Sequence, residues 1–251
     1  MRGSSRIFRK PESLHSRRHF LLIGAPRSGT TLLASMLGRH NDVAVINEDT
    51  TGKGLRKIVG KTVTGNKLCV PNQIRLKRNI FAFRLLKKVG LVAESPRSRF
   101  SIEDYLELSN LSIVAIVRDG NDTISSMMER GKSSFKRASK RWAEAIETIY
   151  ELRTRLPARV LVLTFEDLVL NPEETLGAAC SFLGLTFQKQ MLEGQRYNPK
   201  YPQGKLDEEK VHRYKKGGGD FRLALGRPST YRKFEELLVL ARQSPIAPVD
   251  G

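Results

Sequence analysis

The stretch HFLLIGAPRSGTTLLASML, residues 19–37, decides how the chain folds. It begins with a short apolar run that ends at Gly24, which is typical of an interior strand in a parallel sheet. From Thr30 onward the apolar residues have helical spacing, and Gly38 stands near the end of that run. We therefore expect a strand, a glycine-rich loop and a helix. In this arrangement the unsatisfied N–H groups and the dipole at the helix N-terminus bind a phosphate-like anion.

The loop departs from the pattern that holds nucleoside triphosphates. In GxxxxGK[ST], Gly24 and Gly29 match, but Thr30 stands where the lysine is required. The cation that would reach the β- and γ-phosphates is therefore missing. Arg27 precedes this position and supplies a planar guanidinium suited to bidentate recognition of an anion. Further donors are the hydroxyl groups of Ser28, Thr30 and Thr31. The loop is built for a different anion.

The length of 251 residues suits one α/β domain. We expect a flexible basic leader at 1–18, a single domain at 19–240 and a C-terminal tail at 241–251. The longest apolar runs are much shorter than the roughly 18 to 20 residues of a membrane helix, and the basic N-terminal stretch lacks the apolar segment of a secretory signal. A cytoplasmic location without a transmembrane segment is the default expectation.

The chain is strongly basic, with 44 Lys+Arg against 26 Asp+Glu and a net charge of +18. This excess indicates an anionic partner, and a phosphorylated cofactor, nucleic acid, an acidic glycan or an anionic membrane face would each satisfy it. A solvated basic surface is the alternative for any single cluster. Cys69 and Cys180 are far apart and lack metal-ligand spacing, so we expect two buried thiols and no metal site.

Apolar strands alternate with helices along the rest of the chain. VAVIN is expected to close a first β-α-β unit, LSIVAIV and RVLVLTF are further strands, NKLCV is a weaker one, and a helix at 135–154 buries Trp142. This alternation predicts a three-layer α/β fold, with a central parallel sheet flanked by helices. Ligands of such sheets bind beyond the carboxyl ends of the strands, where GAPRSGTT, NEDTTGKG and RDGND all fall.

Two further motifs connect the loop to a known family. IVRDGNDTISS places Arg118 at the end of an expected strand and Ser126 eight positions later on the following helix. VLTFEDLVLNPEETLGAACSFLGL combines a strand with a helix opened by Pro172. Together with GAPRSGTTLL, these segments resemble the sulfotransferases that use 3'-phosphoadenosine-5'-phosphosulfate (PAPS). The resemblance spans roughly residues 19–222.

The resemblance implies a fold like that of P-loop nucleotide hydrolases, PAPS as co-substrate, 3'-phosphoadenosine-5'-phosphate (PAP) as product, and no metal. It assigns one set of residues to the 5'-phosphosulfate, namely Arg27, Ser28, Gly29, Thr30 and Thr31. It assigns Arg118 and Ser126 to the 3'-phosphate. A strand that ends at Arg118 and a helix that returns Ser126 to the same edge can flank one phosphate between them.

The basic tail carries a third motif of this family. YKKGGGDFR is similar to the RKGxxGDWK loop that covers the 3'-phosphate in cytosolic members, and it gives that role to Lys215, Lys216 and Gly217. The loop is one residue shorter here, and Phe221 replaces the tryptophan. Glycines in such a loop let backbone amides approach an anion closely. An irregular basic loop without a ligand is the alternative for this stretch.

The proton of the acceptor requires a base. HNDVAVINED resembles the HPDVAVPPE of bacterial and carbohydrate-directed members, which places Glu48 in that role, with Asp49 as a possible substitute. GNKLCVP is similar to a GDKTP element near the acceptor of bacterial members. Lys67 would then stabilise developing charge or bind an anionic acceptor; a surface lysine is the alternative. His40 is expected to end the first helix, and His212 lies in the tail.

The expected reaction is in-line transfer of a sulfuryl group to a hydroxyl, or else an amine, of a small-molecule, lipid or carbohydrate acceptor. The acceptor can itself be anionic; specific nucleic-acid binding is not expected, and peripheral membrane contact and the oligomeric state stay open. A P-loop kinase or NTPase is one alternative, although it needs a lysine at position 30. A non-catalytic polyanion-binding module, suggested by the charge, is the other.

Overall fold

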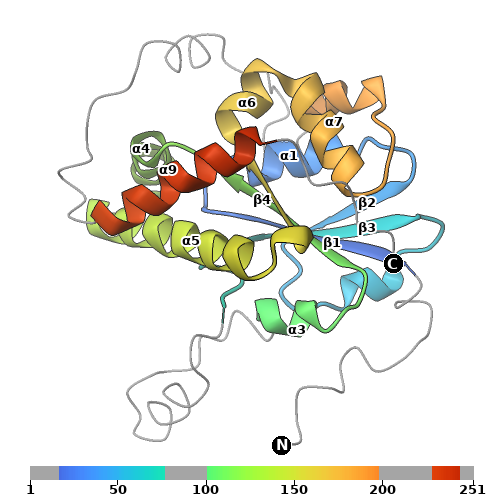
Figure 1. The fold of residues 1–251 in the computed structure, drawn as a ribbon, viewed down its shortest axis with the longest axis horizontal. Coiled ribbons are helices and arrows are strands. Elements are labelled where there is room, and N and C mark those ends of the chain that lie inside the picture. The colour runs from blue at the N-terminus through green and yellow to red at the C-terminus, as the bar shows by residue number, and fades with distance from the viewer. Residues whose placement is uncertain (1–16, 77–100, 198–227, 244–251) are drawn as a thin grey trace, which may run out of the picture.

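The structure is a computed structural model that describes residues 17–76, 101–197 and 228–243. Its centre is a parallel five-stranded sheet in the order β2-β3-β1-β4-β5 (Figure 1). The strands are β1 (Arg18–Gly24), β2 (Val43–Asn47), β3 (Val63–Cys69), β4 (Leu111–Val117) and β5 (Val160–Thr164). Because β1 is the middle strand, it delivers the glycine-rich loop between the ends of β3 and β4.

Helices cover both faces of the sheet (Figure 1). They are α1 (Thr30–Leu37), η2 (Gly54–Lys57), α3 (Ile102–Leu106), α4 (Gly120–Gly131), α5 (Phe135–Arg155), η3 (Pro157–Arg159), α6 (Phe165–Leu170), α7 (Pro172–Phe182), η4 (Lys189–Tyr197) and α9 (Pro228–Arg242). Leu21 and Ile23 of β1 belong to the core beneath α5 and α9, whereas Phe20 and Leu22 belong to the core beneath α1 and α7. The predicted three-layer α/β fold is confirmed.

The strand β3 lies between β1 and β2, so β2 does not pair with β1 as the first β-α-β unit predicted. The sequence predicts only a weak strand here because Asn66 and Lys67 interrupt the apolar pattern. In the structure both side chains are nevertheless buried. Gly65 is required beside them, since a Cβ there would lie 2.2 Å from the Phe20 ring. Polar residues occupy the middle of the sheet because they belong to the site described below.

The helix α5 crosses one face of the sheet, and α9 lies alongside it (Figure 1). Trp142 of α5 is 1% exposed and packs with its ring centroid 5.1 Å from that of Tyr231 and 5.6 Å from that of Phe234. Such tilted and edge-on contacts are the favourable geometries for aromatic rings. The predicted helix at 135–154 and the core position of Trp142 are thus confirmed.

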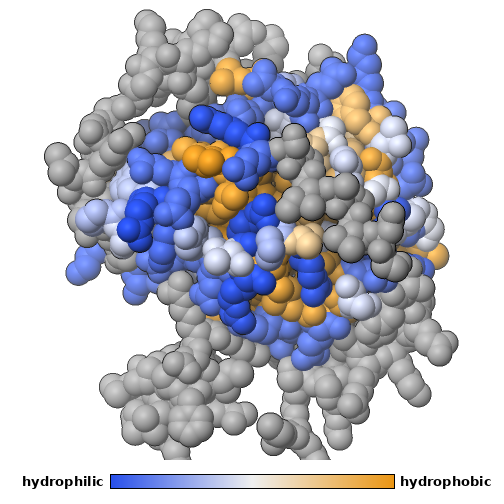
Figure 2. Space-filling model, viewed as in Figure 1, coloured by the Kyte–Doolittle hydropathy of each residue, from blue (hydrophilic) through white to orange (hydrophobic). Residues whose placement is uncertain are grey.

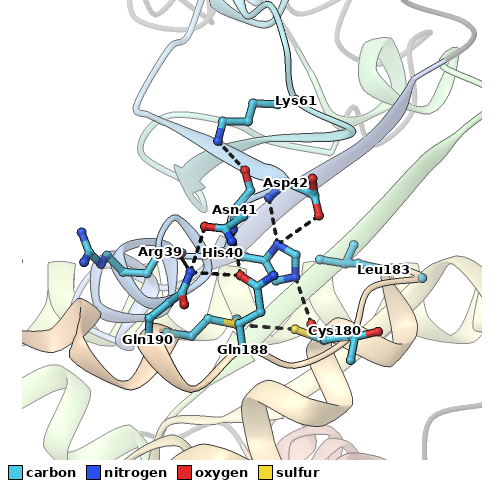
Figure 3. Close-up of polar contacts among 12 residues, drawn as sticks. Arg39, His40, Asn41, Asp42, Lys61, Cys180, Leu183, Gln188 and Gln190 are labelled. Carbon is cyan, nitrogen blue, oxygen red and sulfur yellow. Dashed lines mark hydrogen bonds and ion pairs between the residues drawn. The ribbon is translucent and has the colours of Figure 1, made fainter.

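The amino edge of the sheet is tied to the segment after α7 by His40 (Figure 3). The ring is buried; its Nε2 donates to the Thr186 carbonyl oxygen at 2.9 Å, and its Nδ1 accepts from the Asp42 N–H at 3.0 Å. These two bonds use both ring nitrogens, Nε2 as a donor and Nδ1 as an acceptor. Nearby, Gln190 donates to Asn41 at 2.9 Å. His40 therefore has a structural role just beyond α1, at the edge opposite the glycine-rich loop.

Both cysteines are free thiols, but only Cys180 is fully buried. Its burial raises the pKa of the thiol to about 11. Cys69 is half-buried, so the prediction of two buried thiols holds for Cys180 alone. The face drawn in Figure 2 mixes hydrophilic and apolar side chains. Within the described ranges, no helix is long and apolar enough to cross a membrane.

Some predicted features lie outside the described residues. These are the tail residues Lys215, Lys216, Gly217 and His212. The structure has β1 beginning at Arg18 and α9 ending at Arg242. The division into a leader, one domain and a tail stays a prediction.

Candidate active site

The loop between β1 and α1 is held by backbone conformations that few residues adopt. Arg27 and Gly29 have φ angles of 74° and 96°. Ser28 closes the turn, because its N–H and its hydroxyl donate to the Ala25 carbonyl oxygen at 3.1 and 2.8 Å. A Cβ at Gly24 would lie 2.5 Å from the Ser28 hydroxyl oxygen, so only glycine fits at the end of β1. The sequence motif therefore corresponds to a tightly folded turn.

This turn opens the N-terminus of α1 toward the carboxyl edge of the sheet. Gly29 caps the helix without a side-chain hydrogen bond, and the first turn of α1 contains no acidic residue. The positive end of the helix dipole is therefore not offset by a carboxylate of α1 itself. Thr30 starts the helix, and its hydroxyl lies 3.8 Å from the Cys69 sulfur at the end of β3. These features suit an anion at this position.

The structure brings the second predicted motif to the same loop. Arg118 follows β4, and its Nη1 donates to the Arg27 carbonyl oxygen at 3.0 Å. Arg27 in turn donates from Nε to the hydroxyl of Ser126, on α4, at 3.1 Å. Two guanidinium groups and a hydroxyl from segments about 90 residues apart thus lie together. The resemblance required this juxtaposition, and the structure has it.

Arg118 is oriented by contacts on several sides. Its guanidinium lies 4.4 Å from the centre of the Phe165 ring, and its Nη2 lies 3.7 Å from the Asp122 carboxylate. Its carbonyl oxygen accepts from the Trp142 indole N–H at 3.2 Å. The side chain is 13% exposed. A guanidinium held in this way loses little conformational freedom when an anion binds.

Two carboxylates beside Arg118 were missed by the sequence reading. Asp119 is the N-cap of α4, where its side chain accepts from the N–H groups of Asn121 and Asp122. Glu166, just after β5, accepts the Asp119 N–H at 3.1 Å. Burial raises the pKa of Glu166 to about 7, although hydrogen bonds and Arg118 oppose the shift. The available signal was the EDL of VLTFEDLVLNPEETLGAACSFLGL, which contains Glu166 without indicating its neighbours.

Glu48 and Lys67 form an ion pair at the carboxyl edge of β2 and β3. Glu48 follows β2 in a left-handed conformation with φ of 65°, and its N–H donates to the Lys67 carbonyl oxygen at 2.9 Å. The Lys67 ammonium donates to the Glu48 carboxylate at 2.7 Å. The Lys67 side chain is 1% exposed and that of Glu48 33%. Lys67 is therefore a buried partner of Glu48, and the interpretation as a surface lysine is wrong.

Asp49, the alternative base, is engaged in folding its own loop. Its carboxylate accepts from the Thr51 N–H at 2.9 Å, the Thr51 hydroxyl at 2.6 Å and the Gly54 N–H at 2.6 Å. Burial alone would raise the pKa of Asp49, but these hydrogen bonds outweigh it and the pKa lies below its usual value. The Asp49 carboxylate is therefore committed to the conformation of its own loop, whereas the Glu48 carboxylate pairs with Lys67.

The turn at Glu48 is held from below by Asn66. This buried side chain donates to the Asp49 carbonyl oxygen at 2.7 Å and accepts from the Asp49 N–H at 3.4 Å. It also donates to the hydroxyl of Tyr105, on α3, at 2.7 Å. Burial raises the pKa of Tyr105 to about 12, so this hydroxyl stays neutral. Asn66 therefore fixes the backbone next to Glu48.

The two halves of the site are on neighbouring strands. Lys67 of β3 pairs in register with Leu22 of β1, and Cys69 pairs with Gly24, where the glycine-rich loop begins. The carboxylate of Glu48 and the anion-binding loop therefore share the carboxyl edge of the sheet. The described part of the chain holds no cluster of His, Cys, Asp and Glu that could bind a metal ion.

Comparison with known proteins finds similarity to sulfotransferases. A model described as the sulfotransferase family matches residues 94–189. The chain is 26% identical over 200 residues to the protein-tyrosine sulfotransferase of Drosophila melanogaster, which covers 69% of this chain and 39% of that protein. It is 26% identical over 197 residues to protein-tyrosine sulfotransferase 2 of Gallus gallus, with coverage of 67% and 52%. The chain is therefore similar in sequence to the sulfotransferase family. It spans about half or less of the length of these relatives.

Solved structures of sulfotransferase domains have a similar fold. The sulfotransferase domain from the Synechococcus PCC 7002 olefin synthase superposes with a TM-score of 0.61 at 16% identity, covering 91% of this chain and 97% of that one. The sulfotransferase domain from the curacin biosynthetic pathway gives 0.58 at 16% identity, covering 88% and 98%. At such identities the similarity establishes the fold alone. The predicted P-loop-like architecture is confirmed.

Proposed function

We propose that this sulfotransferase transfers a sulfuryl group from PAPS to a hydroxyl group, with Glu48 as the base. The observation that carries the proposal is the cluster of Arg27, Arg118 and Ser126 at the carboxyl edge of β1 and β4, at the same edge as Glu48, which follows β2 on the other side of β3. The cluster supplies donors for two anionic groups, and Glu48 supplies a proton acceptor beside it.

The residues present fit a donor with phosphate-like groups at two positions. The helix N-terminus after Gly29 carries no acid of its own, which suits the 5'-phosphosulfate. Arg118 and Ser126 lie where a strand end and a helix flank the 3'-phosphate. A mouse sulfotransferase, SULT7A1, solved in complex with PAP, superposes with a TM-score of 0.50 at 17% identity, covering 92% of this chain and 88% of that one. That complex supports PAP as the product here.

When bound, PAPS supplies an activated sulfuryl group with a good leaving group. Arg27 and the loop N–H groups stabilise negative charge at the leaving oxygen. Glu48 takes the proton from the acceptor hydroxyl at its carboxylate. The buried Lys67 ammonium, 2.7 Å away, keeps that carboxylate oriented. A carboxylate paired in this way is a modest base, which suits a proton that leaves as the oxygen–sulfur bond forms.

The acceptor group is a hydroxyl of a small molecule, a lipid or a carbohydrate, and an amine is the alternative. The acceptor molecule can itself be anionic. The names of the relatives add the hydroxyl of a tyrosine in a protein as a further candidate. The loops after β2 and β3 that lead away from Glu48 and Lys67 would form the acceptor side. The cytoplasmic location stays a prediction.

The test is donor-dependent transfer of labelled sulfate by two variants. Glu48→Gln should lower kcat by about 100-fold or more while the PAP Kd stays within about twofold, because only the proton acceptor is lost. Arg118→Ala should raise the PAP Kd by about 10- to 100-fold, because a desolvated guanidinium is removed. Lys140→Ala, on the exposed side of α5, is the matched control and should change neither.

Unchanged turnover in both site variants would defeat these assignments. Calorimetry separates the kinase alternative, because a P-loop kinase prefers ATP with magnesium to PAP. Thr30, which replaces the lysine of that pattern, begins α1 and lies near Cys69, so no cation stands at this position. Uptake of magnesium-ATP with no response to PAP would replace the proposal.

A further inference from the structure

A carboxylate with no role in the proposed transfer lies directly behind the donor site. Glu166 is on the first turn of α6, and its Oε1 accepts the Asp119 N–H at 3.1 Å. Asp119 follows Arg118, so Glu166 braces the backbone turn that carries the guanidinium. The Glu166 residue is half-buried. An acid in this place is unexpected, since the site is otherwise suited to bind anions.

The other carboxylates around Arg118 each have a hydrogen-bonding or charged partner. Asp119 accepts two N–H groups of α4, and Asp122 lies 3.7 Å from the Arg118 guanidinium. On the same turn of α6 as Glu166, Asp167 accepts from the Thr164 hydroxyl at 2.6 Å. Each of these three acids therefore has a charged or hydrogen-bonding partner close to its side chain. Among the described residues, the hydrogen bonds to the Glu166 carboxylate come from backbone N–H groups.

The charged groups that act on Glu166 come from the turn after β4. Arg118 favours its ionised form, and Asp119 disfavours it. Burial is the largest effect and raises the pKa of Glu166 to about 7, close to the pH of the cell interior. A phosphate group bound to Arg118 would add one or two negative charges near Glu166. It would also weaken the favourable interaction between the Arg118 guanidinium and the Glu166 carboxylate. Both changes make ionised Glu166 less favourable.

We propose that Glu166 binds a proton when the donor or its bisphosphate product occupies the Arg118 site, and releases it when the site empties. The inference rests on the proposed function, which assigns the 3'-phosphate to Arg118. The step is a simple protonation: the carboxylate takes H⁺ from solvent to become a carboxylic acid, and one of its oxygens continues to accept the Asp119 N–H. Glu166 is thus a positioning residue whose charge is removed only in the loaded site.

Uptake of a proton on binding makes the affinity for PAP depend on pH. Because the bound state holds the extra proton, PAP affinity falls as the pH rises through about 7. If binding moves the titration of Glu166 well above this range, the PAP Kd rises by about fivefold between pH 7 and 8. The 3'-phosphate, whose second ionisation lies near pH 6, acts in the opposite direction because the dianion binds more tightly. A variant without the acid separates the two contributions.

The experiment is calorimetric titration of the full chain with PAP at pH 6.5 to 8.5, in buffers of different ionisation enthalpy. The comparison is between wild type and Glu166→Gln, whose amide oxygen can still accept the Asp119 N–H. Wild type should take up about half a proton more than Glu166→Gln at pH 7 and show the steeper fall in affinity. Glu174→Gln, exposed on α7, is the control and should behave as wild type.

An infrared difference spectrum of the wild-type protein gives a readout that does not depend on the variant's folding. PAP binding at pH 7.5 should produce the carbonyl band of a protonated carboxylic acid. Equal proton uptake by wild type and Glu166→Gln, or no such band, would overturn the inference while leaving the proposed function intact. A wild-type protein that does not bind PAP at all would overturn both.

Discussion

Two residues of the site, Arg27 and Glu48, have left-handed backbone conformations, with φ of 74° and 65°. Such conformations cost roughly 1 to 2 kcal/mol for residues that carry a Cβ. At both positions neighbouring contacts hold the chain in place: Ser28 closes the first turn, and Asn66 fixes the residue after Glu48. The strain is located where the side chain is needed, which is the usual place for it in enzymes.

A matched pair of variants at Arg27 tests this reading. Arg27→Ala and Arg27→Gly both lose the guanidinium, and both should raise the PAP Kd by about 10- to 100-fold. The glycine variant should be more stable than the alanine variant by about 1 kcal/mol, because glycine adopts positive φ without strain. Urea unfolding measures the difference in the free energy of unfolding. An alanine variant as stable as the glycine variant would show that the turn is not strained.

The pKa of Glu166 also makes a prediction for stability. The value is raised from 4.5 to about 7, so the stability linked to this group is present below pH 4.5 and is lost as the pH rises through 7. Relative to wild type, Glu166→Gln should therefore gain roughly 1 to 2 kcal/mol in the free energy of unfolding between pH 5 and pH 8. A shift of this size in a fully dehydrated site would give about 3 kcal/mol, and partial solvation reduces it.

Urea unfolding at pH 5 and pH 8 provides the measurement, with Glu174→Gln as the exposed control. The control should show the same pH dependence as wild type, because its carboxylate is exposed on α7. A parallel pH dependence of wild type and Glu166→Gln would mean that burial does not perturb Glu166.

Among the elements, β3 shows most clearly what a sequence pattern can predict. LSIVAIV and RVLVLTF are predicted without difficulty because β4 and β5 are apolar on both faces. In β3, Asn66 and Lys67 are buried but polar, and hydropathy alone underestimates the strand. The polar residues are tolerated since each has partners, in Asp49, Tyr105 and Glu48. The residues that weaken the pattern are those that build the site.

Asn66 is expected to control catalysis through the position of Glu48. Asn66→Ala removes its bonds to the Asp49 N–H and carbonyl oxygen, so the turn at Glu48 can relax. We expect kcat to fall by about tenfold or more, because small misplacements of a base are costly, while the PAP Kd stays unchanged. Steady-state kinetics and PAP calorimetry measure the two effects separately.

Tyr105→Phe is the control for this variant. It removes the hydroxyl that accepts from Asn66 and costs stability, by about 1 to 2 kcal/mol, but leaves the bonds between Asn66 and Asp49 in place. Its kcat should stay within about twofold of wild type. If Asn66→Ala kept full kcat, the backbone at Glu48 would have to hold its conformation without the clamp.

For the molecule as a whole, the sequence predicts the donor side of the site better than the acceptor side. The proposed donor side is encoded in short contiguous motifs, each a strand end joined to a helix start, so the resemblance to PAPS-dependent sulfotransferases points to Arg27, Arg118 and Ser126. The hydrogen bond from the Asp119 N–H to the Glu166 carboxylate depends on the tertiary arrangement of β4 and β5, which no local sequence pattern records. The acceptor side similarly depends on how loops from different strands meet, and the sequence offers only the resemblance that points to Glu48.

The carboxyl edge of the sheet holds the candidate site, whereas the amino edge holds contacts that stabilise the fold. A variant of His40 tests whether the two edges are independent. At the amino edge its ring joins the turn before β2 to the segment after α7 through Asp42 and Thr186 (Figure 3). His40→Ala leaves two part-buried backbone groups without these partners and opens a cavity where the buried ring lay, so the free energy of unfolding should fall by about 2 to 4 kcal/mol. Asn41→Ala, on the exposed side of the same cluster, should cost less than about 1 kcal/mol.

Because both positions lie at the edge opposite the donor loop, the PAP Kd of the folded variants, measured by calorimetry, should match wild type. A Kd raised by about tenfold in His40→Ala would show instead that packing at the amino edge sets the geometry of the donor loop through α1.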